Sequence, residues 1–323
     1  MKHSLLSATL MLSLLAPAAM AEELKFANFM APTHPYVTGA FEPFAQAVAD
    51  GTGGEVTVKL YNGGELGAGP VEQYSRVVDG VAELAVSLPG YTASQFPLTL
   101  TAELPGVLEE ATGTETLWNN LDAFSQDYRR VKLVGLWSSA ENILFTASKP
   151  VRTLDDIKGM KIRVPSRNTG LLVETWGATP VSMPVSEIYN ALQTGVIDGA
   201  MIDGTAVNAF KLAEVANYIT MGMETTNSPF FVVMNRDVYE GLTAEQQAAM
   251  DAAGKQLSLD GQKVQLTVAE KGIADFKGTS GKEVIVLDEA AAAPFNEAAD
   301  TVTAQAIAET DGGQAIVDAL AAK

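Results

Sequence analysis

One arginine stands where a side chain could bind a small anion. Alternation along a predicted strand over residues 160–164 places Arg163 on the face opposite Ile162. In open α/β sheets ligands bind beyond the carboxyl ends of the strands, so Arg163 would lie where an anion approaches. A guanidinium binds a carboxylate through two parallel charge-assisted hydrogen bonds. The chemistry indicated is recognition of a carboxylate, although an arginine at the end of a strand is more often simply solvated.

An α/β pattern surrounds this arginine. Strand, helix, strand, helix and strand are predicted over residues 160–164, 169–176, 179–182, 187–194 and from 198 onward. The turn at residues 166–168 leads into the first of these helices, whose unpaired N–H groups also favour an anion. The sequence therefore predicts an α/β unit with a cationic edge.

Three motifs in this unit carry a resemblance to a known family. They are residues 159–165 (GMKIRVP), 177–180 (GATP) and 187–199 (EIYNALQTGVIDG). Together with residues 63–67 (GGELG) and 87–91 (SLPGY), they make the chain resemble the substrate-binding proteins of tripartite ATP-independent periplasmic (TRAP) transporters, the DctP-like family. The resemblance implies an α/β, two-lobed periplasmic binding protein fold that closes on an organic acid, with Arg163 as the carboxylate anchor.

The amino-terminal residues predict export. Residues 1–21 combine a charged start, an apolar run and small residues before the cleavage point, which is the pattern of a secretory signal peptide. No later segment reaches the roughly 20 apolar residues that a membrane-spanning helix needs. We therefore expect a mature protein that begins near Glu22, lies in the periplasm and is not inserted in the membrane.

Composition argues against several classes of function. The chain has no cysteine, and its 39 acidic and 21 basic residues give a formal net charge of −18. Without cysteine there are no disulfides, no thiolate metal sites and no cysteine nucleophile. The acidity argues against nucleic acid and against an anionic membrane surface as partners. The overall field would also repel an organic anion, so recognition requires a local cationic pocket.

The length predicts two lobes, because about 300 mature residues exceed one ordinary core. Lobe 1 is assigned to residues 22–145 with 226–250, and lobe 2 to residues 146–225. Residues 251–323 are expected to supply a lobe-spanning helix and carboxyl-terminal segments that pack on the lobes. A further helix is predicted over residues 114–128 of lobe 1.

The lobe-spanning helix is implied by the resemblance and supported by the pattern. Helical periodicity runs for about 35 residues from Leu242, and Thr243 with Gln246 form a capping box. Gly254 and Gly261 are expected to bend this helix, since each costs about 1 kcal/mol relative to alanine.

Candidate ligand contacts come from the ends of the predicted strands and from the loops that follow them. Besides Arg163 they are His34, Tyr91, Trp137, Asn142, Ile143, Val185, Ile202, Asp203 and Phe230. Tyr91 is carried over from the resemblance, and Trp137 would form a second aromatic wall. His34 could contact the ligand or cap local backbone. Asp203 could accept a hydrogen bond from a ligand hydroxyl or ammonium, or cap a helix.

Two departures from the commonest family pattern bear on the ligand. Many members carry a second arginine where this chain has Ile143, and Gln-Glu-Asn where it has residues 200–202 (AMI). A second ligand carboxylate would therefore be buried without a partner, which is costly. We expect a monocarboxylate with an apolar or aromatic body, held by Arg163 and a mostly apolar wall.

The predicted function is capture of this acid by lobe closure and delivery to the small and large membrane subunits of a TRAP permease. No cofactor or metal is expected, because no His/Asp/Glu cluster has the spacing of metal ligands. A carboxylate-based hydrolase using Glu174, Asp198 and Asp203 is one alternative, weakened by the absence of the usual nucleophilic triads. A receptor that presents its ligand to a sensor kinase is another, and the sequence does not separate it from a permease receptor.

Overall fold

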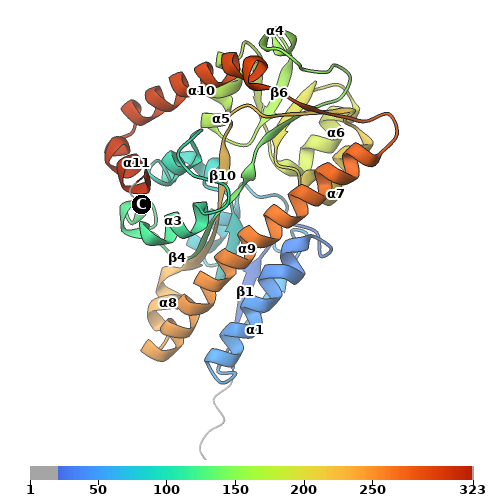
Figure 1. Ribbon diagram of the computed structural model, residues 1–323. Coiled ribbons are helices and arrows are strands. Elements are labelled where there is room, and N and C mark those ends of the chain that lie inside the picture. The colour runs from blue at the N-terminus through green and yellow to red at the C-terminus, as the bar shows by residue number, and fades with distance from the viewer. Residues whose placement is uncertain (1–20, 322–323) are drawn as a thin grey trace, which may run out of the picture.

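The computed structural model describes residues 21–321, so the predicted signal peptide lies outside the described residues except for Ala21. Each of two lobes is built on its own β-sheet with helices packed around it, and one long helix crosses both (Figure 1). The predicted α/β, two-lobed fold is confirmed by this arrangement. Among the described helices, none is long and apolar enough to cross a membrane.

The sheet of lobe 1 has five strands in the order β2-β1-β3-β10-β4. They are β1 (Glu22–Ala27), β2 (Val56–Tyr61), β3 (Leu84–Ser87), β4 (Val131–Glu141) and β10 (Asn227–Asn235). The first three strands are parallel, whereas β10 runs antiparallel to both β3 and β4. Helices α1 (Glu42–Gly51), α2 (Gln73–Val78), α3 (Gly113–Asn119) and α8 (Arg236–Gly241) belong to the same lobe. Because β10 returns late in the chain, the sheet of lobe 1 is completed only after most strands of lobe 2, which lie within residues 143–221.

The sheet of lobe 2 has six strands in the order β11-β9-β5-β8-β6-β7. They are β5 (Ile143–Thr146), β6 (Lys161–Val164), β7 (Thr179–Ser182), β8 (Gly199–Ile202), β9 (Tyr218–Met221) and β11 (Glu283–Val286). Its helices are α4 (Leu154–Ile157), α5 (Arg167–Thr175), α6 (Ile188–Gln193) and α7 (Ala206–Ala209). β6 is parallel to both β7 and β8, as expected for the α/β unit around Arg163.

The boundary between the lobes differs from the sequence assignment. β5 pairs with β8 and β9, so lobe 2 begins at Ile143 rather than at residue 146. The pairing partners of β5 lie more than 50 residues away in the sequence, so local pattern did not indicate which sheet this strand joins. β11, expected among the carboxyl-terminal packing segments, adds the edge strand of this sheet.

The lobe-spanning helix is α9 (Ala244–Gly278), which has 35 residues and begins with the predicted capping box of Thr243 and Gln246. It runs through both interior glycines as one helix. A Cβ at Gly254 would lie 2.1 Å from the carbonyl oxygen of Val134, and one at Gly261 would lie 3.1 Å from the Trp137 ring. The glycines therefore let α9 lie directly on β4. From the sequence they were expected to bend the helix instead.

The helix predicted over residues 114–128 is wrong in its second half. α3 ends at Asn119, and a short 3-10 turn, η4 (Leu121–Phe124), follows. Asn120 has φ −125° and ψ 23°, outside the helical region, and its side-chain amide donates to the carbonyl of Thr116 at 2.9 Å. An asparagine that bonds to nearby backbone in this way competes with the helix.

Two helices close the chain. α10 (Glu289–Glu309) packs on lobe 2 through its alanine-rich face and Phe295. α11 (Gly313–Ala321) packs Ile316 and Leu320 into the apolar cluster of lobe 1. The carboxyl-terminal segment thus connects the two lobes on the side away from α9 (Figure 1).

Candidate ligand-binding site

A small cavity lies between the lobes. The space open to the centre of a water molecule is about 40 Å³, which is enough for more than one water. Eight of the ten predicted contacts line it: His34, Tyr91, Asn142, Arg163, Val185, Ile202, Asp203 and Phe230. Side chains of lobe 1 and of lobe 2 therefore meet at one site, as the closed form of a two-lobed receptor requires.

Arg163 sits at the end of β6 and points into the interior rather than into water, with only 1% of its surface exposed. Its Nε donates to the carbonyl oxygen of Met183 at 3.0 Å, and Nη1 donates to that of Met201 at 3.1 Å. Its Nη2 donates to the hydroxyl of Tyr91, on lobe 1, at 3.0 Å. A guanidinium has five N–H groups, so two remain, one on each terminal nitrogen. An end-on bidentate carboxylate takes one N–H from each terminal nitrogen.

Asp203 is the nearby acid that balances part of the charge of Arg163. Burial lowers the pKa of Arg163, and Tyr91 and the nearby Asp203 act in the opposite direction; a guanidinium nevertheless stays protonated at neutral pH. Burial raises the pKa of Asp203. One Asp203 oxygen accepts from the backbone N–H of Thr205 at 2.9 Å and the other from the side-chain amide of Gln265 at 3.0 Å. Asp203 therefore forms a turn before α7 and lies on the cavity wall, but it does not cap that helix, whose N-cap residue is Thr205.

A hydrogen-bonded chain ties the cavity to the long helix. Gln265 of α9 also bonds to the hydroxyl of Tyr36, which in turn accepts from Nε1 of Trp137 at 3.0 Å. Through these contacts α9 holds groups of lobe 1 and, at Asp203, of lobe 2. The side-chain oxygen of Gln265 accepts from Tyr36 and its nitrogen donates to Asp203, so this amide has one orientation.

Trp137 and Ile143 lie outside the cavity lining. Trp137 is fully buried and stacks on Phe230 with the ring centroids 5.3 Å apart and an interplanar angle of 11°. It therefore supports the wall from behind, while Phe230 supplies the surface. Ile143 pairs with Ile202 across the strands and packs in the apolar core of lobe 2.

His34 caps local backbone and also lies on the cavity wall, and its contact with a ligand stays a prediction. Its Nδ1 accepts from the backbone N–H of Tyr36 at 3.2 Å, and the ring lies on the cavity wall 5.7 Å from the ring of Phe210. Burial lowers the pKa of His34 to about 4. The ring is therefore neutral at physiological pH and adds no second cation to the site.

Asn142 lies where the chain crosses from β4 to β5. Its side-chain amide nitrogen donates to the hydroxyls of Thr226 and Ser228 at 2.9 and 3.1 Å, and its backbone N–H donates to the carbonyl of Thr226 at 2.9 Å. The two strands that connect the lobes are thereby fastened together directly beside the cavity.

The remaining lining residues were not predicted. They are Phe29, Met30, Tyr36, Leu88, Pro165, Thr205, Phe210, Ser228 and Gln265. Phe29 and Met30 lie in the loop that follows β1. Side chains of this loop are expected to face the cleft because ligands bind beyond strand ends, although only His34 was named there as a contact. Gln265 lies in the middle of a 35-residue helix, where no local signal distinguishes it from its neighbours.

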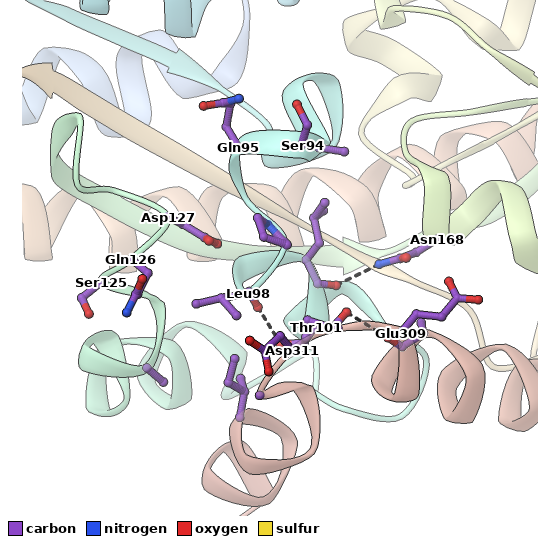
Figure 2. Close-up of a pocket in the computed structure, with 18 of the residues that line it drawn as sticks. Ser94, Gln95, Leu98, Thr101, Ser125, Gln126, Asp127, Asn168, Glu309 and Asp311 are labelled. Atoms are coloured by element: carbon purple, nitrogen blue, oxygen red, sulfur yellow. Dashed lines mark hydrogen bonds between the residues drawn. The ribbon is translucent and has the colours of Figure 1, made fainter.

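A larger cavity of about 1090 Å³ lies beside the first, between the loops of lobe 1, the start of α5 and the junction of α10 and α11 (Figure 2). It contains Asp127, Asn168 and Glu309 but not Arg163. Its size does not make it the better candidate, because it lacks a buried cation with spare donors. Within residues 21–321, no group of three His, Asp or Glu side chains is arranged to hold a metal ion.

Comparison with known proteins identifies the family. The model of the bacterial extracellular solute-binding proteins, family 7 (DctP), matches residues 26–310. The chain belongs to this family. Among curated DctP relatives, the ectoine/5-hydroxyectoine-binding periplasmic protein of Ruegeria pomeroyi is 28% identical, over 80% of this chain and 79% of its own. The C4-dicarboxylate-binding periplasmic protein of Rhodobacter capsulatus is 25% identical over 94% and 95%.

A solved DctP-type structure gives the same fold. A TRAP solute-binding protein from a marine metagenome, described as specific for aromatic acid ligands and bound to 3-hydroxybenzoate, has a TM-score of 0.84 and 26% identity. The match covers 93% of this chain and 97% of that one. The predicted family and fold are confirmed, and so is the class of solute-binding proteins. The named ligands of these relatives differ, so family membership alone does not select one.

Proposed function

We propose that this protein captures a small organic monocarboxylate with an apolar or aromatic body by lobe closure. The observation that carries the proposal is Arg163, a buried cation in a mostly apolar cavity with two N–H groups left for a ligand. Burying a charge is costly, and a ligand carboxylate that bonds to the guanidinium lowers that cost. The likeness to an aromatic-acid-binding protein of the same fold supports this ligand class.

A single carboxylate fits this cavity better than two. Arg163 is its one cationic lining residue, because His34 is neutral there. Asp203 would repel a second carboxylate, and the walls formed by Ile202 and Phe230 offer it no donor. A hydroxyl on the ligand, by contrast, would find acceptor capacity on Asp203.

Lobe closure is supported by hydrogen bonds that join a residue of lobe 1 to residues of lobe 2. The hydroxyl of Tyr91 in lobe 1 accepts from two groups of lobe 2, the guanidinium of Arg163 at 3.0 Å and the backbone N–H of Val185 at 3.2 Å. A ligand that touches both lobes favours the closed form by its differential affinity for that form. The crossings near Asn142 and Thr226 would act as hinges.

The partners we propose are the small and large membrane subunits of a TRAP permease, and the location is the periplasm. Family membership supports both. The role proposed is transport rather than catalysis. Uptake of the bound acid by cells that carry the permease, with and without this protein, measures this part of the proposal directly.

Titration calorimetry with a panel of acids tests the ligand class. We expect tight binding of aromatic monocarboxylates such as 3-hydroxybenzoate, with the radius of gyration decreasing on binding. We expect no measurable binding of succinate or malate. Tight binding of those dicarboxylates with none of the monocarboxylates would contradict the proposal, as would turnover of any bound acid by the pure protein.

A further inference from the structure

The lobes also meet at a seam outside the ligand cavity. The seam is formed by Gly90 and the 3-10 helix η3 (Thr99–Glu103) of lobe 1, and by the start of α5 in lobe 2. The side-chain amide of Asn168 donates to the carbonyl of Leu100 at 2.9 Å (Figure 2). A Cβ on Gly90 would lie 2.9 Å from that of Ser166, so the two backbones are nearly in contact. Closure therefore brings these two segments together as tightly as a protein core.

Glu103 is the one acid at the lobe 1 side of this seam. It ends η3, and only 1% of its surface is exposed. Ser166 and Asn168, at the start of α5 in the opposite lobe, are polar neighbours of its carboxyl group that lower its pKa, against the larger effect of burial. Its Oε2 has no hydrogen-bond partner among the described residues. A carboxylate in that position would keep a charged oxygen in a dry environment, which is costly, whereas a protonated carboxyl group would not.

We propose that closing the lobes buries Glu103 at this seam and makes it take up a proton, so that ligand binding is coupled to protonation. The inference rests on the lobe closure proposed above. When the lobes are apart, the start of α5 no longer covers η3, and the carboxylate is hydrated. The seam thus makes the closed form more stable in mildly acidic surroundings.

No other charge compensates Glu103 in the closed form. Burial is the main cause that raises the pKa of Glu103, to about 7, and no charged group contributes to the shift. Among the elements packed on η3, β10 carries no charged side chain from Asn227 to Asn235. Asp127, below η3, accepts from the backbone and hydroxyl of Thr99 at 2.7 and 2.8 Å and is itself an acid.

The charged groups on the neighbouring helices are engaged elsewhere or exposed. Arg167, next to the seam on α5, pairs with Glu309 of α10 at 2.9 Å. Asp318 of α11 accepts from Gln314 at the surface, and Glu174 lies exposed at the far end of α5. Because Arg167 is already paired and no cation acts on the Glu103 carboxyl group, the proton remains the available means of neutralising it.

The sign of the effect follows from the direction of the shift. The closed form binds the proton of Glu103 up to about pH 7, while a hydrated glutamate releases it above about pH 4.5. Between these values closure takes up a proton, so affinity weakens by up to about tenfold for each unit of rising pH. Above about pH 7 the penalty is constant.

The experiment compares the wild type with Glu103→Gln, which is isosteric and carries no charge, and with Glu174→Gln as the surface control. Scattering of the ligand-free proteins from about pH 5.5 to about pH 8.5 measures the closed fraction without any ligand. Calorimetry with 3-hydroxybenzoate, which stays ionised over this range, is run near pH 7 in two buffers of different protonation enthalpy and gives the protons taken up on binding.

We expect the wild type and Glu174→Gln to close more as the pH falls and to take up a fraction of a proton with the ligand. Glu103→Gln should show neither effect and should bind more tightly than the wild type above about pH 7. Equal pH dependence in all three proteins, or none in any, would overturn the proposal. Should 3-hydroxybenzoate fail to bind, the proposed ligand class fails, and the scattering of the wild type still decides the role of Glu103.

Discussion

The cavity around Arg163 and the seam around Glu103 are closed by the same two lobes, yet one buries a basic side chain and the other an acidic one. Arg163 retains two unused N–H groups after bonding to Met183, Met201 and Tyr91. Glu103 retains an unpaired oxygen. In the closed form, Arg163 therefore still needs an anion to accept from its remaining N–H groups. Glu103 still needs a proton to neutralise its carboxyl group. One closing motion can therefore respond both to the concentration of the ligand and to the pH.

The two places also differ in how firmly the closed contacts are built. At the cavity, Tyr91 bridges the lobes through charge-assisted bonding to a guanidinium, which is the stronger kind of hydrogen bond. At the seam, the bridge at 2.9 Å joins a neutral amide, Asn168, to a backbone carbonyl. We therefore expect substitutions at the cavity to have larger effects than those at the seam.

The largest effect is expected from Arg163→Ala. Removing one partner of a buried charge pair costs about 2–5 kcal/mol, so affinity for 3-hydroxybenzoate should fall by about thirtyfold to a few thousandfold. Titration calorimetry measures it, and Arg152→Ala is the control, since Arg152 forms a surface ion pair with Glu283. Near-native affinity in Arg163→Ala would contradict the expectation that substitutions at the cavity have larger effects than those at the seam.

Gly90→Ala tests whether the seam must close for the cavity to bind. Its Cβ would meet Ser166 at 2.9 Å and the carbonyl oxygen of Pro165 at 3.1 Å in the closed form. Overpacking of this kind costs about 1–3 kcal/mol, and we expect it to appear as weaker binding with the free energy of unfolding nearly unchanged. Gly241→Ala, with no atom within 4 Å of the added Cβ, is the matched control.

The two regions should also give opposite pH dependence of stability. The pKa of His34 is lowered to about 4, so its contribution is present above pH 6.5 and is lost as the pH falls toward 4. The loss is about 1.4 kcal/mol for the first unit below pH 6.5. The raised pKa of Glu103 acts the other way, stabilising the fold as the pH falls below 7.

Urea unfolding at two pH values separates these contributions. Lowering the pH from about 7 to about 5.5 should destabilise Glu103→Gln more than the wild type and His34→Gln less. Identical pH dependence in both variants would show that the two groups do not differ as proposed.

Asn168→Ala should have the smallest effect. It removes one neutral hydrogen bond across the seam, worth about 0.5–1.5 kcal/mol, and so should weaken binding by about tenfold at most. Asn208→Ala, which removes a surface bond to Asp275, should leave affinity unchanged. An effect of Asn168→Ala equal to that of Arg163→Ala would mean that the seam contributes as much as the cavity.

The sequence by itself indicated the α/β unit, the family and the anchoring arginine. Alternation placed Arg163 at the end of β6, where the guanidinium does lie, and strand ends located most of the predicted lining residues. Period and capping residues fixed α9, because Thr243 and Gln246 act within four positions of each other. These features depend on neighbours in the chain, so local sequence contains them.

The tertiary structure alone decided which aromatic ring forms the wall, which sheet β5 joins and that Glu103 is buried. Trp137 lies behind Phe230 because α9 approaches β4 closely at Gly261. Glu103 has no partner in its own segment, and its neighbours Ser166 and Asn168 lie over 60 residues away. Burial and pKa are properties of surroundings assembled from distant segments, so they emerge only when the two lobes meet.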